Sequence, residues 1–308
     1  MAGSAAAWEL ARRGRSVVLL DRFEQGHERG SSHGGERIVR LAYTSPEYVE
    51  LGLEAIRGWR ELEAQQGIEL LHATGAIDHG FDDELDEVEA AYRRCGVRSA
   101  WLTAAEAMER WPGLRFDGRV LLQPDGGWVQ ADLALRTFVA AAAGLGAEVR
   151  FGEPVLGIED TADAVHVHAA GASWKAAAVV VAAGAWAPGL VPGGVDLPAL
   201  RVTQEQVAYF EPRPGLDWPC FIHRSAPLLY GLPTPDGRVK VGEHQTGPVV
   251  DPDRRTFDLE PVAWQRLVDS VPAWVPGLAP EPVRGLTCLY ATTATDDFVL
   301  DRVGRVVA

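Results

Sequence analysis

Near its start the chain carries Ala2-Gly3-Ser4-Ala5-Ala6-Ala7-Trp8-Glu9-Leu10-Ala11-Arg12-Arg13-Gly14, then the apolar run Ser16-Val17-Val18-Leu19-Leu20, then Asp21. This pattern predicts a helix of small residues packed against a strand. Gly3 has the place of the third glycine of G-x-G-x-x-G, where a missing side chain lets helix and sheet approach. Asp21 has the place of the carboxylate that accepts hydrogen bonds from a ribose. The run therefore predicts the second half of a dinucleotide-binding βαβ unit; the alternative is an alanine-rich helix before an ordinary buried strand.

The composition is that of a globular protein. The 308 residues are 47% hydrophobic and 23% charged, enough for one large domain or two ordinary ones. The formal charge of −14 argues against nucleic acid or an anionic membrane as a partner. The longest apolar run, residues 176–186, is far shorter than the ~20 residues that span a bilayer. Three widely spaced cysteines indicate reduced thiols, so we expect a soluble cytoplasmic protein.

Helix signals punctuate the first half of the chain. Ser45, Pro46 and Gly67 predict the start and the end of a helix over 46–66. Its expected buried stripe is Tyr48, Leu51, Ala55, Trp59 and Leu62. An acidic helix is expected over 82–94, and a helix over 133–143 with Asp132 as its cap.

Strand signals dominate the second half. The apolar residues 178–183 predict a central parallel strand covered on both faces. From about Leu200 the pattern predicts an antiparallel sheet, with strands over 201–210, 228–232, 238–243 and 283–290, a helix over 261–271 and a closing strand over 298–301. We therefore predict an α/β fold, α+β overall. It combines a discontinuous Rossmann-like domain (1–78, 128–198 and 293–308) with an antiparallel-sheet substrate domain (79–127 and 199–292).

A polar loop over residues 24–36 follows Asp21, and a short apolar segment over 37–43 comes next. The run Gly30-Ser31-Ser32-His33-Gly34-Gly35 would let backbone N–H groups approach a ligand. Arg37 and Arg40 follow three residues apart and would share one face of a helix if this segment were helical. Because a guanidinium is a planar, permanently charged fork, both arginines suit carboxylate binding.

The segment Ser32-His33-Gly34-Gly35-Glu36-Arg37-Ile38-Val39-Arg40-Leu41-Ala42-Tyr43 resembles the monomeric sarcosine oxidase and N-methyltryptophan oxidase group of the glycine/D-amino-acid oxidase flavoenzymes. The similarity continues, in order, through residues 183–186 (Ala-Gly-Ala-Trp), 230–231 (Tyr-Gly), 240–244 (Lys-Val-Gly-Glu-His) and 284–290 (Arg-Gly-Leu-Thr-Cys-Leu-Tyr). It implies FAD as cofactor, a small secondary amino acid and O2 as substrates, and a monomer. The first strand and first two glycines of the family's βαβ unit precede Met1 and its glycine-rich C-terminal segment follows Ala308, so we expect an incomplete FAD-binding domain.

The resemblance assigns roles to three residues. The sulfur of Cys288 would be joined as a thioether to the 8α carbon of the flavin. This linkage needs a thiolate, which a positive neighbour such as Arg284 would favour. Lys240, on an apolar strand where a lysine is costly to bury, would lie over the flavin ring and promote reaction with O2. Arg40 would bind the substrate carboxylate, while Arg37 would lie against the flavin near Lys240.

Other site residues follow from the same resemblance. Three side chains would line the substrate side of the flavin: His244, Tyr230 and Tyr290. The expected FAD-binding residues, besides Arg37 and Cys288, are Gly3, Asp21, Ser32, His33, Val155, Gly184 and Trp186. Cys95 and Cys220 are expected to be structural, and His166 and His168 to lie on a polar sheet face without a metal.

These assignments lead to one hypothesis and two rivals. The amine would lose a hydride equivalent to the flavin, the resulting imine would hydrolyse, and O2 would be reduced to H2O2. One rival is an inactive or cofactor-poor fragment of such an oxidase. The other is a noncovalent dinucleotide-dependent dehydrogenase.

Overall fold

The computed structural model describes residues 1–192 and 197–308. Its largest element is a sheet of eight strands in the order β17-β13-β16-β15-β14-β4-β6-β5. All neighbours are antiparallel except the parallel pair β4 and β14. The strands are β4 (Ala76–Gly80), β5 (Ala100–Leu102), β6 (Val120–Gln123), β13 (Arg201–Pro212), β14 (Cys220–Arg224), β15 (Leu229–Pro233), β16 (Val239–Glu243) and β17 (Leu278–Thr292).

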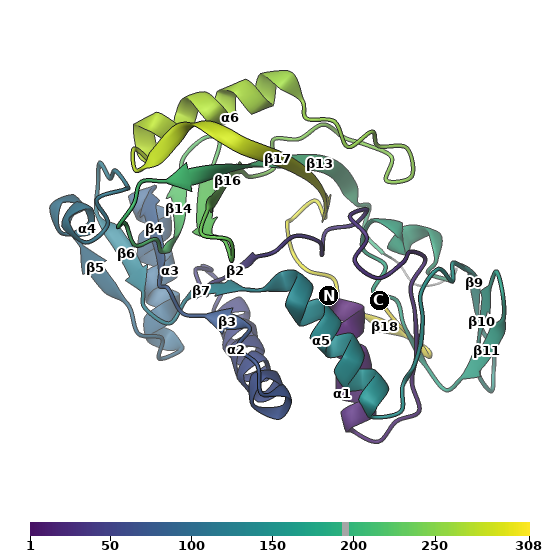
Figure 1. The fold of residues 1–308 in the computed structure, drawn as a ribbon. Coiled ribbons are helices and arrows are strands. Elements are labelled where there is room, and N and C mark those ends of the chain that lie inside the picture. Colours follow the sequence, from purple (N-terminus) through teal and green to yellow (C-terminus); the bar gives the residue numbers. More distant parts are fainter. Residues whose placement is uncertain (193–196) are drawn as a thin grey trace.

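Helix α6 (Pro261–Trp274) lies along β13 and β17 (Figure 1). Its Leu267 and Val271 are buried in one core with Phe210 and Phe221 of the sheet. Burial of such side chains contributes roughly 1.5–3 kcal/mol each, so this core holds the helix on the sheet.

The second part of the molecule contains both chain ends (Figure 1). Its core joins Ala7 and Trp8 of α1 to Phe138 of α5. Small residues on both helices let them pack closely, which is why the alanine-rich start of the chain is helical here. The elements are α1 (Ala2–Arg12), α5 (Ala131–Gly144), the parallel pair β1 (Val18–Leu20) and β8 (Glu148–Arg150), the three strands β9 (Val155–Asp160), β10 (Val165–Ala169) and β11 (Ser173–Ala176), and β12 (Val179–Val180), which pairs in parallel with β19 (Val306–Val307) beside β18 (Arg302–Val303).

A small sheet connects the two parts. Its order is β2-β7-β3, with β2 (Arg37–Val39), β3 (Leu71–His72) and β7 (Gly127–Val129). The helical elements around it and the large sheet are α2 (Pro46–Gln66), α3 (Asp82–Arg94), α4 (Ala104–Arg110) and the 3-10 turn η1 (Gly184–Gly189). No helix of the described residues is both long enough and apolar enough to cross a bilayer.

The predicted mixed α/β class is confirmed, as are the helices over 46–66 and 82–94 and the antiparallel sheet after residue 200. Gly67 ends α2 in the left-handed conformation (φ 65°), as its position predicted. The buried stripe of α2 was wrong at Leu51, which is 54% exposed, and at Ala55, which is also exposed. Leu62 is buried as expected, in the core with Ala7 and Trp8 of α1. The other buried apolar side chain is Val49, because the core with Leu85 and Val88 of α3 lies on a different face of the helix from Leu51.

Three further predictions need correction. Asp132 is not the cap of α5, because the helix already begins at Ala131 and places Asp132 in its first turn. There the helix dipole still stabilises a carboxylate. Residues 178–183 form only the short parallel strand β12, at the edge of its sheet, and Val180 is 44% exposed. Residues 298–301 are not in a strand, since Phe298 and Leu300 are exposed with no core to cover them and β18 begins only at Arg302.

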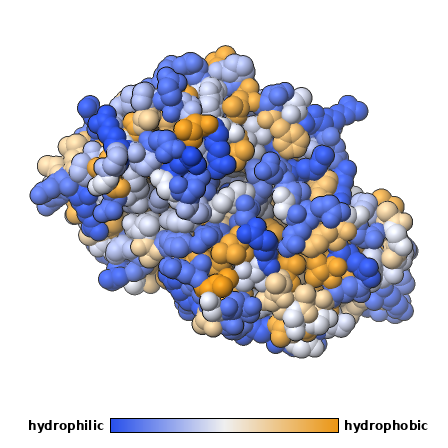
Figure 2. Space-filling view, viewed as in Figure 1, coloured by the Kyte–Doolittle hydropathy of each residue, from blue (hydrophilic) through white to orange (hydrophobic). Residues whose placement is uncertain are grey.

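Apolar side chains gather on the face seen in Figure 2 over the region of α1, α5 and β18. The exposed apolar residues of this part of the molecule include Leu10, Val18, Val180, Leu300 and Val303. Its small sheets are therefore less completely covered than the eight-stranded sheet.

A buried histidine pair in the large sheet predicts sensitivity to acid. His79 and His223 face each other on β4 and β14, with Nε2 of His79 3.1 Å from Nδ1 of His223. Burial, and secondarily His223, lower the pKa of His79 to about 3. Below the ordinary histidine pKa the unfolded chain therefore binds a proton that the folded chain does not, and stability falls as the pH drops from about 6.5 toward 3.

We expect the free energy of unfolding to lose about 1.4 kcal/mol per pH unit through His79 between pH 6 and pH 4. Urea unfolding at several pH values should show a shallower acid slope for His79→Gln than for the parent. The exposed His168 on β10 offers a matched control, His168→Gln. Equal slopes in the His79→Gln variant and the parent would contradict this account.

Candidate active site

Lys240 lies in the middle of the large sheet. It sits on β16 opposite Tyr209 of β13 and Leu232 of β15, and is 5% exposed. Its Nζ lies 2.8 Å from Oε1 of Glu36, which is 1% exposed and also accepts a hydrogen bond from the Tyr209 hydroxyl at 3.0 Å. Burial lowers the pKa of Lys240, and the carboxylate of Glu36 opposes that effect. Lys240 is thus a buried lysine whose acidic contact, among the described residues, is Glu36.

The arginine beside Glu36 organises the glycine-rich loop. Arg37 donates hydrogen bonds to the carbonyl oxygens of Ser31 (2.6 Å), His33 (2.5 Å) and Glu36 (2.8 Å). The Ser31 hydroxyl in turn donates to the carbonyl of Leu289 on β17 at 2.5 Å. These bonds hold residues 31–37 against the strand that carries Cys288.

Cys288 is a half-buried free thiol on β17, opposite Glu205 of β13. Burial raises the pKa of the thiol, whereas the cations of Arg37, Lys240 and Arg255 oppose this rise. Arg284 is not the neighbour that we expected to favour the thiolate. Four residues along an extended strand span about 13 Å, which separates Arg284 from Cys288. The Arg284 guanidinium lies instead over the ring of Tyr209, 4.0 Å from its centroid.

Two buried side chains next to this cluster have polar atoms without partners among the described residues. His33 is 8% exposed, and neither Nδ1 nor Nε2 has a hydrogen-bond partner. Arg255, also 8% exposed, uses Nη2 for the carbonyl of Glu28 at 2.7 Å and leaves Nε and Nη1 free. Burial, and then Arg37, lower the pKa of His33 to about 4. Unpaired buried donors cost about 1–3 kcal/mol each, so a ligand rich in acceptors, such as the ring system of a flavin, fits here.

The residues expected at the nucleotide end lie close together. A Cβ on Gly3 would come within 3.3 Å of the Ala182 side chain, so the absent side chain does permit close helix packing. Asp21 follows β1 and accepts from the Phe23 N–H at 2.9 Å, with its carboxylate partly exposed. Ser32 accepts a hydrogen bond from the Met1 amino group at 3.1 Å. This corner therefore offers a carboxylate and a hydroxyl beside the N-terminus of α1.

Three other expected FAD ligands surround the same corner. The Asp21 carbonyl accepts a hydrogen bond from the Glu153 N–H at 2.9 Å, and Val155 follows Glu153 by two residues. Gly184 has φ 54°, a left-handed conformation that favours glycine. Trp186 donates from Nε1 to Asp253 at 3.0 Å and packs against Phe23.

The expected substrate-side residues meet around Tyr290. The rings of His244 and Tyr290 lie 5.4 Å apart. Burial is the main cause that raises the pKa of Tyr290 to about 12. Cys288 adds to this rise, whereas Tyr230 opposes it. Burial lowers the pKa of His244, and Arg40 is one of the charges that act on it.

The segment that carries the two arginines is not helical, so the condition for a shared helix face is not met. Arg37 begins β2, and Arg40 lies just after this strand, where it donates to the Ala42 carbonyl at 2.6 Å. Pairing of β2 with β7 imposes an extended backbone on residues 37–39. Arg37 is among the charges that act on the pKa of Cys288, whereas Arg40 is among those that act on the pKa of His244.

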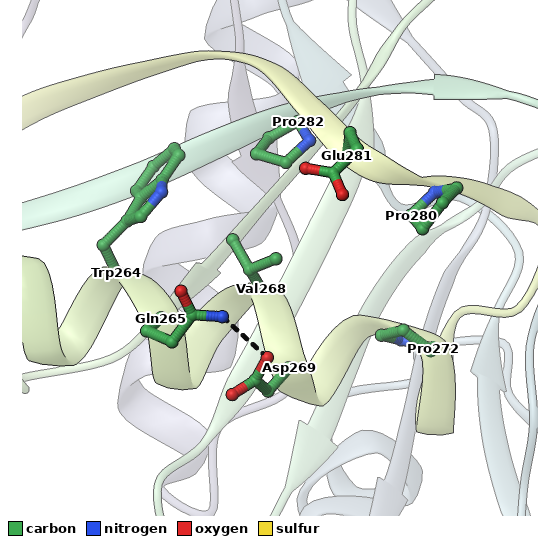
Figure 3. Close-up of a pocket in the computed structure, with 8 residues that line it drawn as sticks. All are labelled: Trp264, Gln265, Val268, Asp269, Pro272, Pro280, Glu281 and Pro282. Carbon is green, nitrogen blue, oxygen red and sulfur yellow. Dashed lines mark hydrogen bonds between the residues drawn. The ribbon is translucent and has the colours of Figure 1, made fainter.

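A hollow elsewhere contains none of these residues. It lies between α6 and β17 and has a volume of about 620 Å³. Its lining residues, drawn in Figure 3, are Trp264, Gln265, Val268, Asp269, Pro272, Pro280, Glu281 and Pro282. It holds no group with the chemistry described above, so the candidate site is the cluster around Lys240 and Cys288.

Comparison with known proteins defines the family. The family model described as DAO, FAD dependent oxidoreductase, matches residues 1–308. The chain belongs to this family. Human peroxisomal sarcosine oxidase is 34% identical, over 97% of this chain and 81% of that protein. An N-methyl-L-tryptophan oxidase of Yersinia pestis is 28% identical, over 97% of this chain and 83% of that protein.

A solved structure agrees with this assignment. The open form of NikD, described as an unusual amino acid oxidase essential for nikkomycin biosynthesis, superposes with a TM-score of 0.87 at 27% identity. The match covers 99% of this chain and 85% of that chain. This chain is thus an FAD-dependent oxidoreductase with the amino-acid-oxidase fold.

Two residues of the cluster were missed from the sequence. Glu36 stands inside the Ser32–Tyr43 segment, and the signal available was a carboxylate directly before Arg37. Arg255 follows Arg254 in the polar segment Asp251-Pro252-Asp253-Arg254-Arg255 and gave no signal, because only the fold buries it near Cys288.

Proposed function

We propose that this chain oxidises a secondary amino acid, N-methylated or cyclic, and passes the electrons to O2. The observation that carries the proposal is the convergence of Lys240, Arg37 and Cys288 from three distant parts of the chain, beside the unpaired donors of His33 and Arg255. Similarity to sarcosine oxidase and N-methyl-L-tryptophan oxidase supports a small N-alkyl amino acid as substrate.

FAD, when bound, supplies the acceptor for the hydride equivalent of the amine and the donor that reduces O2 to H2O2. Lys240 would hold a positive charge where negative charge develops on O2. Cys288 would hold the cofactor covalently. His33, Arg255 and Arg37 would donate hydrogen bonds to it.

Arg40 would bind the substrate carboxylate. Its charge also influences the pKa of His244. Tyr230, Tyr290 and His244 would enclose the rest of the substrate. The lowered pKa of His244 keeps its imidazole neutral at pH 7, which avoids a second cation beside the amine.

Division of labour between two domains follows the same proposal. The FAD-binding domain would comprise 1–78, 128–198 and 293–308, with Gly3, Asp21, Ser32, Val155, Gly184 and Trp186 around the nucleotide. The substrate domain would comprise 79–127 and 199–292. The eight-stranded sheet supports this division, because its strands lie within residues 76–123 and 201–292, and only the first three residues of β4 precede the boundary at residue 79. The protein would act as a monomer.

The direct test is anaerobic mixing of the purified protein, loaded with FAD, with sarcosine, N-methyltryptophan and a cyclic secondary amino acid. Bleaching of the visible flavin band by at least one of them, followed by recovery of the band and H2O2 on admission of air, is the expected result. Bleaching without reoxidation would favour a dehydrogenase. Failure to bind FAD would favour a cofactor-poor fragment.

Arg40→Gln is expected to raise KM for the best substrate on the order of 10- to 100-fold, because one charged hydrogen bond is lost. Steady-state kinetics at saturating O2 would measure this change. The matched control is Arg57→Gln, on an exposed position of α2. The same loss for a substrate analogue that lacks the carboxylate would contradict the role of Arg40.

A further inference from the structure

The contact between Glu36 and Lys240 goes beyond what the sequence indicated for either residue. Both are buried, at 1% and 5% exposed, and their charged atoms are 2.8 Å apart. Removing two such charges from water is costly, and geometry this close is needed to offset it. The burial of Glu36 against the lysine proposed to promote the reaction with O2 therefore indicates a role for this carboxylate in the chemistry of that lysine.

The hydrogen bonds of Lys240 show how its ammonium is oriented. An ammonium has three N–H donors. One points to Oε1 of Glu36 and a second to the backbone carbonyl of the same residue, at 3.1 Å. Because both bonds end on one residue, Glu36 sets the direction in which the third N–H points.

The carboxylate is itself held in place. The Tyr209 hydroxyl donates to Oε1 at 3.0 Å, and Arg37 donates to the Glu36 carbonyl at 2.8 Å. Tyr209 lies on β13, the strand next to Lys240, so the sheet register fixes both members of the pair. Glu36 therefore cannot leave Lys240 without breaking these bonds as well.

The other charges around Lys240 do not stabilise its ammonium as Glu36 does. Arg37, from the same loop, repels it, and His33 is electrostatically linked to it as well. Cys288 on β17 also influences the pKa of Lys240, and Lys240 influences the pKa of Cys220 on β14. Each thiol is neutral unless it is deprotonated. Glu36 is the one carboxylate within salt-bridge distance of Lys240 in the described residues.

We propose that Glu36 is a positioning residue that keeps Lys240 a charged ammonium and aims its free N–H at the cofactor side of the sheet. This inference rests on the proposed function, in which that charge promotes the reaction with O2. Without Glu36, burial and the repulsion from Arg37 would favour the neutral amine. The enzyme would then lose its cation while keeping the lysine.

The first measurement does not depend on activity. Urea unfolding of the parent, Glu36→Gln, Lys240→Met and the double variant forms a double-mutant cycle. We expect the double variant to be more stable than the sum of the single changes predicts, by at least about tenfold in the unfolding equilibrium constant, because each single change leaves a buried charge alone. Additive effects would overturn the pair.

The second measurement is the rate of reoxidation of the reduced holoenzyme against pH. The rate should fall as Lys240 loses its proton, and in Glu36→Gln this fall should begin about 1 to 3 pH units lower than in the parent. Glu36→Asp, which keeps the charge, should restore part of the range. A pH profile of Glu36→Gln that matches the parent, or oxygen reactivity that rises at every pH, would overturn the proposal.

The matched control is Glu63→Gln. Glu63 is also a buried glutamate, paired with Arg60 and with the N–H groups of Leu70 and Leu71 in another part of the molecule. It should destabilise the fold without moving the pH profile. If Lys240→Met leaves reoxidation unchanged, the oxygen role in the proposed function fails, whereas the double-mutant cycle still measures the pair by itself.

Discussion

Replacing Cys288 with serine is expected to give a protein that releases all of its FAD on acid precipitation, whereas the parent keeps the yellow colour in the pellet. The physical reason is that a serine hydroxyl supplies no thiolate to form the thioether. Cys288 is suited to the linkage because Arg37, Lys240 and Arg255 all favour its deprotonation. The measurement is the flavin absorbance of pellet and supernatant.

The same thiol predicts a pH dependence of attachment. Burial raises the pKa of Cys288 above its ordinary value, so the thiolate fraction at neutral pH is small. When apoprotein is incubated with FAD in air, the attachment rate should therefore rise about tenfold per pH unit up to that pKa. Forming the thioether would replace an 8α C–H bond of the flavin, release its proton and leave the flavin reduced by two electrons, which O2 would accept to give H2O2.

Cys95→Ser is the matched control, because Cys95 is a half-buried thiol that donates to the Pro46 carbonyl away from this cluster. Its flavin should stay in the pellet. Complete release of flavin from the parent protein would show that the cofactor is held without a covalent bond. Retention by Cys288→Ser would show that another residue makes the bond.

Replacing Lys240 with methionine is expected to slow reoxidation of the reduced enzyme by about 100- to 1,000-fold, the usual cost of removing one preorganised electrostatic group. Methionine fills a similar volume without the charge. Reduction by the substrate under anaerobic conditions should change much less, because the carboxylate-binding Arg40 is untouched. Stopped-flow measurement of the two half-reactions separates these effects.

The chain offers a clear control, since its only other lysine is Lys175. Lys175 lies on β11, exposed and paired with Asp163 at 2.8 Å. Lys175→Met should leave both half-reactions as in the parent. Equal losses in both half-reactions of Lys240→Met would contradict a specific role in the reaction with oxygen.

Local patterns in the sequence predicted the elements well where one residue type has one physical consequence. Gly67 ends α2 because glycine tolerates the left-handed conformation, and the apolar alternation after residue 200 produces an antiparallel sheet. The predictions that failed depended on what lies on the other side of an element. Leu51 has helical spacing with Trp59, but the neighbouring α3 covers a different face.

The candidate site divides in the same way. The order of Arg37, Arg40, Lys240 and Cys288 along the chain was enough to predict an FAD-dependent oxidoreductase, because each stands in a recognisable local context. Whether Arg37 and Arg40 share a face was not predictable from their spacing. Pairing of β2 with β7, a contact across more than 80 residues, decided it.

The sequence by itself determined the family, the mixed α/β class and the residue types of the site, since these follow from local composition and from segments in a fixed order. Only the tertiary structure decided which charges meet. Glu36 and Lys240 are 204 residues apart in the chain, and no local rule links them. They come to 2.8 Å because the sheet register and the loop held by Arg37 converge there, and the protonation of a buried lysine depends on such contacts.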